Sequence, residues 1–259
     1  MPTRRKPVIA RAFDKAEQYE EHAHIQRAAA RRLAETITTL QIPADSRILE
    51  IGCGTGFLSR ELAGTLPKAR LLLSDLSASM VGRTRSSLGD EEIRYLVMDG
   101  ERPCLSAAPG FGLICSSLAF QWFDDLGTAL THLTALLAPG GHLAFATLSA
   151  GTFAEWRKAH LESGIRPATR DYPSAAEIAA LCPPGAQMRI EMQTLVEEHR
   201  DGLSFLRGLK AIGAHTPWEP RTPLPPGSMR RVLRAFEEQD ALATYQIAHV
   251  IVSKAPEGL

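Results

Sequence analysis

The sequence lacks an excess of either charge, which argues against two classes of partner. Its 259 residues contain 29 Lys and Arg against 29 Asp and Glu, so the formal net charge is zero. A protein that binds nucleic acid or an anionic membrane through its general surface carries a strong positive balance. We therefore expect no nucleic acid and no membrane as partner. An acidic partner would have to be met by a local basic patch.

Cysteines and long apolar runs are also scarce. The four cysteines are Cys53, Cys104, Cys115 and Cys182. They form no C-x-x-C pair, and the histidines show no zinc-type spacing, so we expect free thiols in a reducing cytoplasm and no metal site. No window has the length of a membrane span, and no apolar stretch follows the basic N-terminus as in a signal peptide.

Apolar residues are ordinary in number, at 44%, and their periodicity alternates between strand and helix along the first part of the chain. We predict a helix over about residues 14–40 with a break at 19–22, strands at 47–51, 70–74, 93–97, 111–115 and 142–148, and helices at 58–66, 77–87 and 128–137. Pro139, Gly140 and Gly141 are expected to stop the last of these helices. Alternation with short connections predicts an α/β fold, a doubly wound and mostly parallel sheet with helices on both faces.

The pattern changes after residue 148. We predict helices at 152–161, 174–181, 203–214 and 229–238, and strands at 188–198 and 243–253. The two strands are suited to an antiparallel pair at the edge of the sheet. The segment between them, about residues 200–240, includes a proline-rich loop at 217–226 and is expected to be a helical insertion before the last strand.

The segment from Ile48 to Gly56 carries the clearest chemical signal. Gly52, Gly54 and Gly56 follow a predicted strand and open a predicted helix, which lets backbone N–H groups approach a ligand closely. A dinucleotide fingerprint would have a third glycine where Phe57 stands, which argues against pyrophosphate. Glu50 would repel a diphosphate but suits a cationic sulfonium ligand. A tight turn without a ligand is the alternative.

Acidic residues end the next two predicted strands. Asp75 has the spacing at which a carboxylate accepts hydrogen bonds from both hydroxyls of a ribose, although an Asp here can also cap a helix. Asp99 is suited to an adenine amino group, and Gly100 offers a backbone N–H, although Asp-Gly is also a common turn. Leu76 and Met80 are candidates to sandwich the adenine ring, and both also fit ordinary core packing.

Together these blocks resemble the class I S-adenosylmethionine-dependent methyltransferases. The matching blocks are residues 49–56, Asp75, residues 98–101, residues 116–122 and residues 137–141, in order and at family-like spacing. The resemblance implies S-adenosylmethionine as cofactor. The residues expected to bind it are Gln26, Glu50, Gly52, Cys53, Gly54, Gly56, Asp75, Leu76, Met80, Asp99, Gly100, Glu101, Ser116 and Gln121.

Four further blocks are similar to the malonyl-acyl-carrier-protein O-methyltransferases of biotin biosynthesis. They are residues 13–26, Gln121-Trp122, residues 206–214 and Thr244-Tyr245, whereas the proline-rich loop is less typical. The resemblance implies one domain over residues 1–259, with a helical lid at 1–42, a cofactor-binding core at 43–150 and a C-terminal half at 151–259.

The implied reaction is transfer of a methyl group from S-adenosylmethionine to the free carboxylate of malonyl-acyl carrier protein or malonyl-coenzyme A. Tyr19 is then expected to close over the methyl donor as part of the lid. Arg207 and Lys210, three apart, would dock the acidic carrier protein or hold the malonyl carboxylate; on spacing alone an ordinary solvated helix face is favoured. A carboxylate is already an anion at neutral pH, so no catalytic acid–base pair is expected.

Three other hypotheses have weaker support. A methyltransferase for a free small carboxylate or a quinone precursor conflicts with the block at residues 206–214. A non-catalytic protein that binds S-adenosylmethionine conflicts with the presence of Tyr19 and every glycine of the loop. A nicotinamide-dependent oxidoreductase conflicts with Phe57.

Overall fold

The structure is a computed structural model that describes residues 5–15, 19–89, 92–106, 108, 110–214 and 222–256. Its strands are β1 (Arg47–Ile51), β2 (Arg70–Asp75), β3 (Arg94–Val97), β4 (Phe111–Ser117), β5 (Leu137–Leu148), β6 (Ala186–Glu198) and β7 (Leu242–Lys254). Its helices are α1 (Lys6–Asp14), α2 (Tyr19–His22), α3 (His24–Thr38), α4 (Phe57–Thr65), α5 (Ala78–Leu88), α6 (Leu126–Ala135), α7 (Ala154–Glu162), α8 (Ala175–Ala179), α9 (Gly202–Ala211) and α10 (Pro226–Glu237), with a 3-10 turn η1 (Phe120–Trp122).

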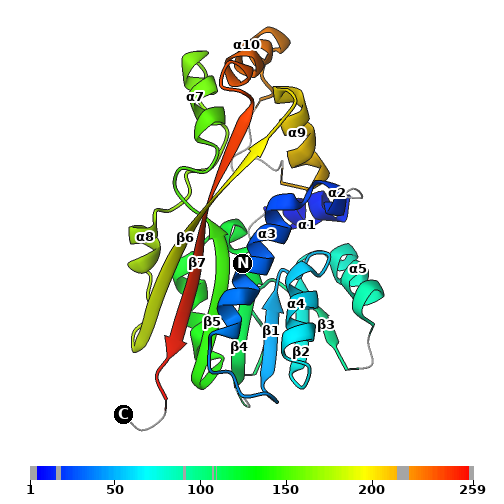
Figure 1. Ribbon diagram of the computed structural model, residues 1–259, viewed down its shortest axis with the longest axis vertical. Coiled ribbons are helices and arrows are strands. Elements are labelled where there is room, and N and C mark those ends of the chain that lie inside the picture. Colours follow the sequence, from blue (N-terminus) through cyan, green and yellow to red (C-terminus); the bar gives the residue numbers. More distant parts are fainter. Residues whose placement is uncertain are drawn as a thin grey trace. The chain divides into compact units, whose positions relative to one another are not determined.

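The strands form one seven-stranded sheet in the order β3-β2-β1-β4-β5-β7-β6 (Figure 1). β1 pairs in parallel with β2 and β4, β2 with β3, and β4 with β5. After β3 the chain crosses to the other side of β1, which makes the gap between β1 and β4 the switch point where ligands of such sheets bind. The predicted doubly wound α/β fold is confirmed.

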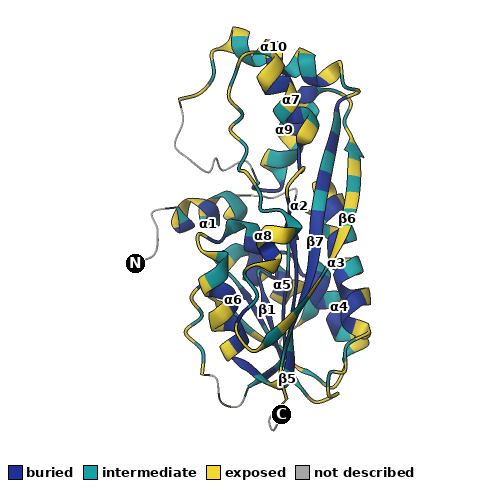
Figure 2. Ribbon diagram, turned by 90° about the vertical axis from the view of Figure 1, so that its left-hand side faces the viewer, coloured by how far each residue is buried: buried dark blue, intermediate teal, exposed yellow. Residues whose placement is uncertain are grey.

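The last two strands form the edge that the sequence suggested. β7 lies beside β5, β6 is outermost, and the two run in opposite directions in Figure 1. Along β6 exposed residues alternate with half-buried ones, as expected for an edge strand with one face against the protein (Figure 2). Helices α9 and α10 fall between β6 and β7 in the chain, where a helical insertion was predicted.

Three element boundaries differ from the prediction. Residues 19–22 were predicted as a break between helices, but they form α2, and the chain leaves the helical conformation at Ala23 instead. β5 begins at Leu137, so Pro139 and the two glycines lie inside a strand and do not mark the end of a helix. Leu137 pairs with Phe111 of β4, and a register shift at Phe111/Leu113, together with the left-handed Gly140, absorbs the irregular segment. Helix α1 lies before residue 14, where the first helix was predicted to begin; a proline in its first turn is compatible with a helix start.

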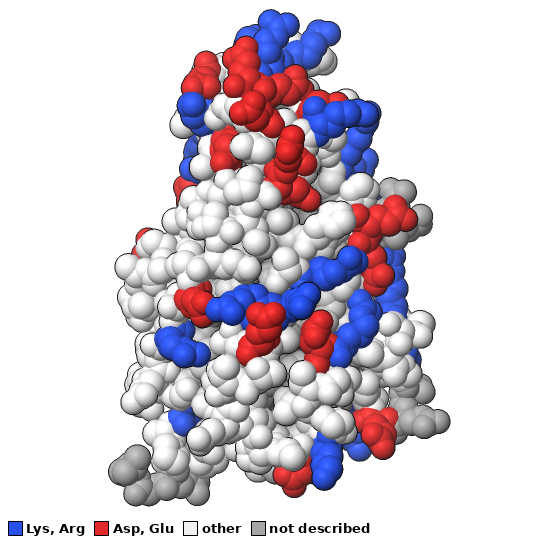
Figure 3. Space-filling model, in the orientation of Figure 1, with Lys and Arg blue, Asp and Glu red and all other residues white. Residues whose placement is uncertain are grey.

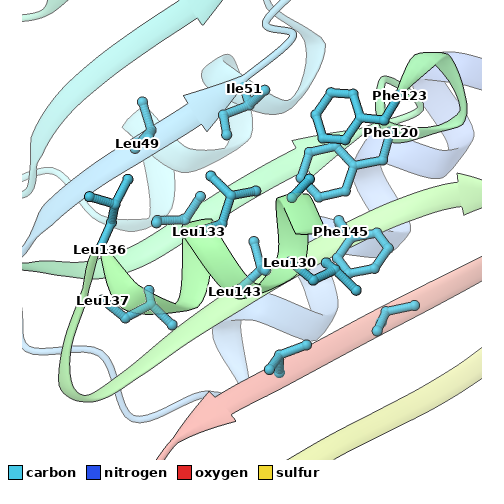
Figure 4. Packing of buried hydrophobic residues seen from close by; sticks show 14 of the residues in the cluster. Leu49, Ile51, Phe120, Phe123, Leu130, Leu133, Leu136, Leu137, Leu143 and Phe145 are labelled. Atoms are coloured by element: carbon cyan, nitrogen blue, oxygen red, sulfur yellow. The ribbon is translucent and has the colours of Figure 1, made fainter. Parts of the chain in front are cut away.

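The chain divides into two compact units. The first comprises residues 1–25, 148–173 and 193–247, and the second residues 26–147, 174–192 and 248–259. The second unit has its core between the sheet and α6, where Phe120 stacks on Phe123 and Phe145 at 4.5 and 4.8 Å between ring centroids (Figure 4). The first unit has an aromatic core in which Trp156 of α7 contacts Phe205 of α9 and Phe236 of α10.

The described residues also bear on the expectations about membrane spans, cysteines and metal sites. None of the described helices is both long and apolar enough to cross a membrane. All four cysteines are free, as a reducing compartment would require, and the cytoplasmic location stays a prediction. Among the described residues no group of three His, Cys, Asp or Glu side chains is placed to hold a metal ion.

Candidate functional site

The glycine loop between β1 and α4 is held against the end of β2. Gly52, Gly54 and Gly56 have φ angles of 73°, 56° and 89°, a region that residues with a side chain seldom adopt. The N–H groups of Gly52 and Cys53 both donate to the Ser74 carbonyl, at 2.7 and 2.9 Å. The loop is therefore a fixed structure and not an open turn.

Gly52 also allows another strand end to approach the loop. A Cβ atom at Gly52 would lie 2.4 Å from the Cβ of Ala119, in the segment that follows β4. Leu118, just before it, has a φ of 50°, and its N–H donates to the Ala146 carbonyl at 2.9 Å. A left-handed non-glycine residue costs free energy, and such residues cluster at functional sites. The carboxyl ends of β1 and β4 thus meet where the topology predicts a ligand.

Asp75 holds the loop from the side of β2. Its Oδ2 accepts a hydrogen bond from the Gly54 N–H at 3.0 Å, and its Oδ1 accepts one from the Ser77 N–H at 2.8 Å. The cap of α5 is Ser77, whose hydroxyl accepts from the Met80 N–H at 3.1 Å. The carboxylate therefore organises the loop, and its role toward a ribose stays a prediction.

Glu50 is buried beneath the loop. Its side chain is 1% exposed, and its Oε2 accepts a hydrogen bond from the Ser59 hydroxyl at 2.6 Å. Burial raises the pKa of Glu50 to about 8, and the Asp75 charge adds to the rise, while the hydrogen bond from Ser59 and the Arg60 charge oppose it. A carboxyl group in this setting gains from a nearby cation, which is what the sequence predicted for its ligand.

The end of β3 is tightly packed. A Cβ atom at Gly100 would lie 2.0 Å from the Cγ2 of Ile51, so only glycine fits there without movement. Asp99 Oδ1 accepts from the Glu101 N–H at 3.1 Å. Glu101 was predicted as a cofactor residue, but its buried carboxylate accepts from the N–H groups of Asp124, at 3.0 and 3.1 Å, and Asp125, at 2.8 Å. This gives Glu101 a structural role beside the predicted one.

Three polar atoms near these strand ends make no hydrogen bond within the described part of the chain. They are Ser116 Oγ, Ser117 Oγ and Gln26 Oε1, and all three are buried. A buried polar group without a partner costs free energy, and a bound ligand is one way to supply the partner. Gln121, also predicted here, donates from Nε2 to the Leu118 carbonyl at 2.6 Å.

The two apolar residues predicted to contact adenine differ in burial. Met80 is fully buried on α5, which agrees with the core packing that the sequence left open, whereas Leu76 is half-buried. Sequence reasoning missed Thr84, whose hydroxyl donates to the Gly54 carbonyl at 2.8 Å, and Ser59, the partner of Glu50. Thr84 follows Met80 by four residues and so lies on the same face of the helix. This spacing is the one signal in the sequence that could have identified it.

The remaining predicted residues belong to the other unit. Tyr19 lies in α2 and is half-buried, and Arg207 and Lys210 lie exposed on α9. These three belong to the first unit, whereas the glycine loop and the strand ends belong to the second. The roles of Tyr19, Arg207 and Lys210 stay predictions.

Comparison with known proteins identifies the family. Residues 48–141 match the family described as "Methyltransferase domain". The chain is 49% identical over 242 residues to the biotin biosynthesis bifunctional protein BioCD of Bordetella avium, covering 93% of this chain and 51% of that protein. It thus spans about half the length of this bifunctional relative. It is 40% identical over 229 residues to the malonyl-[acyl-carrier protein] O-methyltransferase of Magnetococcus marinus, covering 88% of this chain and 84% of that one.

Solved structures agree on the fold. The YcgJ protein of Bacillus subtilis matches with a TM-score of 0.62 at 16% identity, covering 87% of this chain and 98% of that one. An S-adenosylmethionine-dependent methyltransferase of Mesorhizobium loti matches with a TM-score of 0.52 at 20% identity, covering 85% and 96%. The chain shares the fold of these two proteins, and the 40% identity over most of both chains shows that it belongs to the malonyl-[acyl-carrier protein] O-methyltransferase family.

Proposed function

We propose that the chain transfers a methyl group from S-adenosylmethionine to the free carboxylate of malonyl-acyl carrier protein and so forms a methyl ester for biotin synthesis. The observation that carries the proposal is the 40% identity to the Magnetococcus marinus enzyme over 84% of its length. Malonyl-coenzyme A, which presents the same carboxylate, is the second substrate to test. We propose no nucleic acid and no membrane as partner.

The residues at the strand ends fit this cofactor. Glycines at positions 52, 54 and 56 leave three positions of the loop without a side chain, and α4 begins directly after them, so backbone dipoles point toward a ligand there. The buried oxygens of Gln26 and Ser116 are suited to hydrogen bonds with the amino and carboxylate groups of an amino acid. Glu50 is suited to the positive charge.

We propose that the cofactor is held by Gln26, Glu50, Cys53, Leu76, Met80, Ser116, Gln121 and the three glycines, with Asp75 on the ribose and Asp99, Gly100 and Glu101 at the adenine end. When bound, S-adenosylmethionine supplies a methyl group on a positively charged sulfur. A carboxylate oxygen could accept that methyl group without any proton being moved, so the chain would need no catalytic acid or base. The chain therefore has to position the two reactants and exclude water, which contributes up to roughly 7–11 kcal/mol in ideal cases.

We further propose that Tyr19 acts in the lid and that Arg207 and Lys210 contact the substrate. Both basic residues are exposed, and neither forms an ion pair with a carboxylate of the described residues. Lys210→Glu should raise the apparent KM for the protein-bound substrate, because it reverses one charge toward an acidic carrier. An unchanged KM would remove Lys210 from the substrate contacts.

The experiment that tests the function is a three-way assay with methyl-labelled S-adenosylmethionine. Malonyl-acyl carrier protein, malonyl-coenzyme A and a free dicarboxylate are compared at equal concentration. The expected result is label in the malonyl thioesters and none in the free acid. Transfer to the free acid alone would refute the proposal, and growth of a biotin auxotroph on expression of the chain would be an independent check.

A further inference from the structure

Helix α10 carries three arginines on its solvent side. Arg230, Arg231 and Arg234 are exposed, and we call them the arginine face. The opposite side of the helix is apolar, with Val232 and Phe236 fully buried. The spacing of i, i+1 and i+4 places the three guanidinium groups on one side of the helix.

Only Arg234 of the arginine face lies in the last turn of α10, where a positive charge favours the helix dipole, and the three arginines repel one another. Arg230 and Arg234 are four residues apart and Arg231 and Arg234 three apart, and like charges at these spacings cost roughly 0.2–0.5 kcal/mol per pair. The first turn of α10 has no acidic residue to offset them. Glu237 and Glu238 follow at the C-terminal end, where negative charge is unfavourable to the helix dipole.

No carboxylate of the described residues forms an ion pair with the arginine face. The hydrogen bond that these side chains make is from Arg231 Nη2 to the Ser228 hydroxyl, at 3.4 Å. Glu237, the last residue of α10, accepts instead from the Gly202 N–H of α9 at 3.0 Å. Within the described residues, the three cations therefore face solvent without an ion pair.

The helix beneath the arginine face is held firmly. Phe236 packs on Trp156 of α7 and Phe205 of α9, with ring centroids 5.3 and 5.1 Å apart. A Cβ atom at Gly202 would lie 2.8 Å from Leu233, so α9 and α10 are in close contact there. The three helices belong to the same unit, so the arginines stand on a packed support, which lowers the entropy cost of binding through them.

Elsewhere the charges are mixed. The chain has no net charge, and much of the face drawn in Figure 3 carries neither sign; where charged side chains lie in its middle band, Lys and Arg stand beside Asp and Glu. At the top of that view, where Figure 1 places α10, Lys and Arg side chains gather, with acidic side chains below them. A local basic patch attracts a complementary acidic surface and steers its encounter with the protein.

We propose that the arginine face of α10 is a docking surface for the acidic carrier protein that presents the malonyl group. This inference rests on the proposed function and adds the surface that meets the partner. Its contribution is to the association step: the three charges raise the rate of productive encounter and leave the methyl transfer itself unchanged. The exposed stripe of α9 formed by Leu203, Arg207 and Lys210 belongs to the same unit and is a separate contact.

The test neutralises the face without touching the helix core. In the variant Arg230→Gln/Arg231→Gln/Arg234→Gln, kcat/KM is measured with malonyl-acyl carrier protein and with malonyl-pantetheine, which has the same reacting group and no protein. We expect kcat/KM for the carrier substrate to fall about tenfold or more at low salt, with the value for malonyl-pantetheine unchanged. The salt dependence of the carrier reaction should also weaken, because screening acts on the charges that were removed.

A matched control removes three exposed cations from the other unit, in the variant Arg31→Gln/Lys68→Gln/Arg94→Gln. It has the same net charge as the test variant and should keep the wild-type kcat/KM for the carrier substrate. Equal losses in both variants would overturn the proposal in favour of a general charge effect, and no loss in the test variant would overturn it outright. Wild-type protein that methylates no malonyl carrier substrate at all would instead refute the proposed function, so the two failures are distinguishable.

Discussion

Glu50 is a carboxyl group in an environment that opposes its ionisation. It is fully buried, and its pKa of about 8 stands well above its ordinary value of 4.5. Between these two pH values the folded chain binds a proton that the unfolded chain has released, so the stability of the cofactor-free protein falls as pH rises. Glu50→Gln removes this loss. The variant should gain about 2 kcal/mol over the wild type between pH 6 and pH 8, because one pKa unit corresponds to about 1.4 kcal/mol.

The measurement is the Tm of both cofactor-free proteins by differential scanning calorimetry from pH 5 to pH 8.5. Each kcal/mol should shift the Tm by roughly 2–4 °C for a chain of this size. Glu61→Gln, an exposed position on the following helix, is the control and should track the wild type across the range. Parallel curves for Glu50→Gln and the wild type would contradict the account of Glu50.

Alanine substitutions at Gly52 and Gly82 test whether the glycine loop requires a residue without a side chain. Gly52→Ala would place a Cβ 2.4 Å from Ala119 at a φ of 73°, and we expect a loss of about 1–3 kcal/mol in stability together with weaker S-adenosylmethionine binding. Gly82 lies inside α5 with no atom within 4 Å of a Cβ, so Gly82→Ala should stabilise by about 0.5–1 kcal/mol. Urea unfolding and calorimetric titration with the cofactor measure the two effects. Changes of the same sign in both variants would contradict this reading.

Site residues at the ends of strands could be predicted from the sequence, whereas those that reach the site from helices could not. Glu50 and Asp75 lie at the carboxyl ends of β1 and β2, and the glycine loop directly follows β1, so the parallel sheet alone brings them together. Ser59 and Thr84 reach the same loop from helices, and their contacts depend on how each helix rotates and packs on the sheet. No local pattern sets that rotation to within a hydrogen bond, which is why neither residue was predicted.

At the scale of elements, strand β7 carries an acid-sensitive residue. His249 is 2% exposed; burial lowers its pKa to about 4, Arg32 of α3 lowers it further, and Glu191 of β6 opposes the shift. Unfolded histidine titrates near 6.5, so between pH 6.5 and pH 4 the unfolded chain takes up a proton that the folded chain does not, and stability is lost as pH falls. His249→Met should retain up to about 3 kcal/mol more than the wild type at pH 4.

Urea unfolding at pH 7 and pH 4.5 gives the free energy of unfolding of His249→Met and of the wild type, and the two are compared at each pH. The ion pair between Arg32 and Glu191 is partly exposed, so we expect its own contribution to stability to be small. Arg32→Gln should lessen the loss of stability at low pH, because the Arg32 charge lowers the pKa of His249. His132→Gln, exposed on α6, is the matched control. A His249→Met variant as acid-sensitive as the wild type would show that other groups drive the loss.

Elements with a strong local signal were predicted well, and those decided by pairing were not. Ser77 and Ser174 were expected to begin helices, and both accept the capping hydrogen bond. The segment at Pro139 has a strong stop signal, yet it lies inside β5 because Leu137 and His142 both pair with β4. Pairing with β4 outweighed the local preference of this segment, and the local sequence alone does not show which of the two is stronger.

At the scale of the whole molecule, the two units are built from interleaved segments. The chain passes between them five times, after residues 25, 147, 173, 192 and 247, and strands β6 and β7 contribute residues to both. Such a division is not visible in a sequence, where each unit is three separate stretches. The single domain over residues 1–259 stays a prediction. It implies that the whole chain unfolds cooperatively, in one transition.

We expect the two units to unfold in one transition, because neither has a continuous chain and the continuous strands β6 and β7 would have to break at the boundary between them. Trp122 in η1 reports on the second unit and Trp156 in α7 on the first. Two proteins that each retain one of these tryptophans, with Phe at the other and at Trp218, allow separate readings. In each protein the unfolding midpoint measured by fluorescence should coincide with the midpoint measured by far-ultraviolet circular dichroism. The dichroism midpoint of the same protein is the internal control, because it contains any change in stability that the substitutions cause. A fluorescence midpoint displaced from the dichroism midpoint in either protein would mean that the units unfold separately and that the single-domain prediction is wrong.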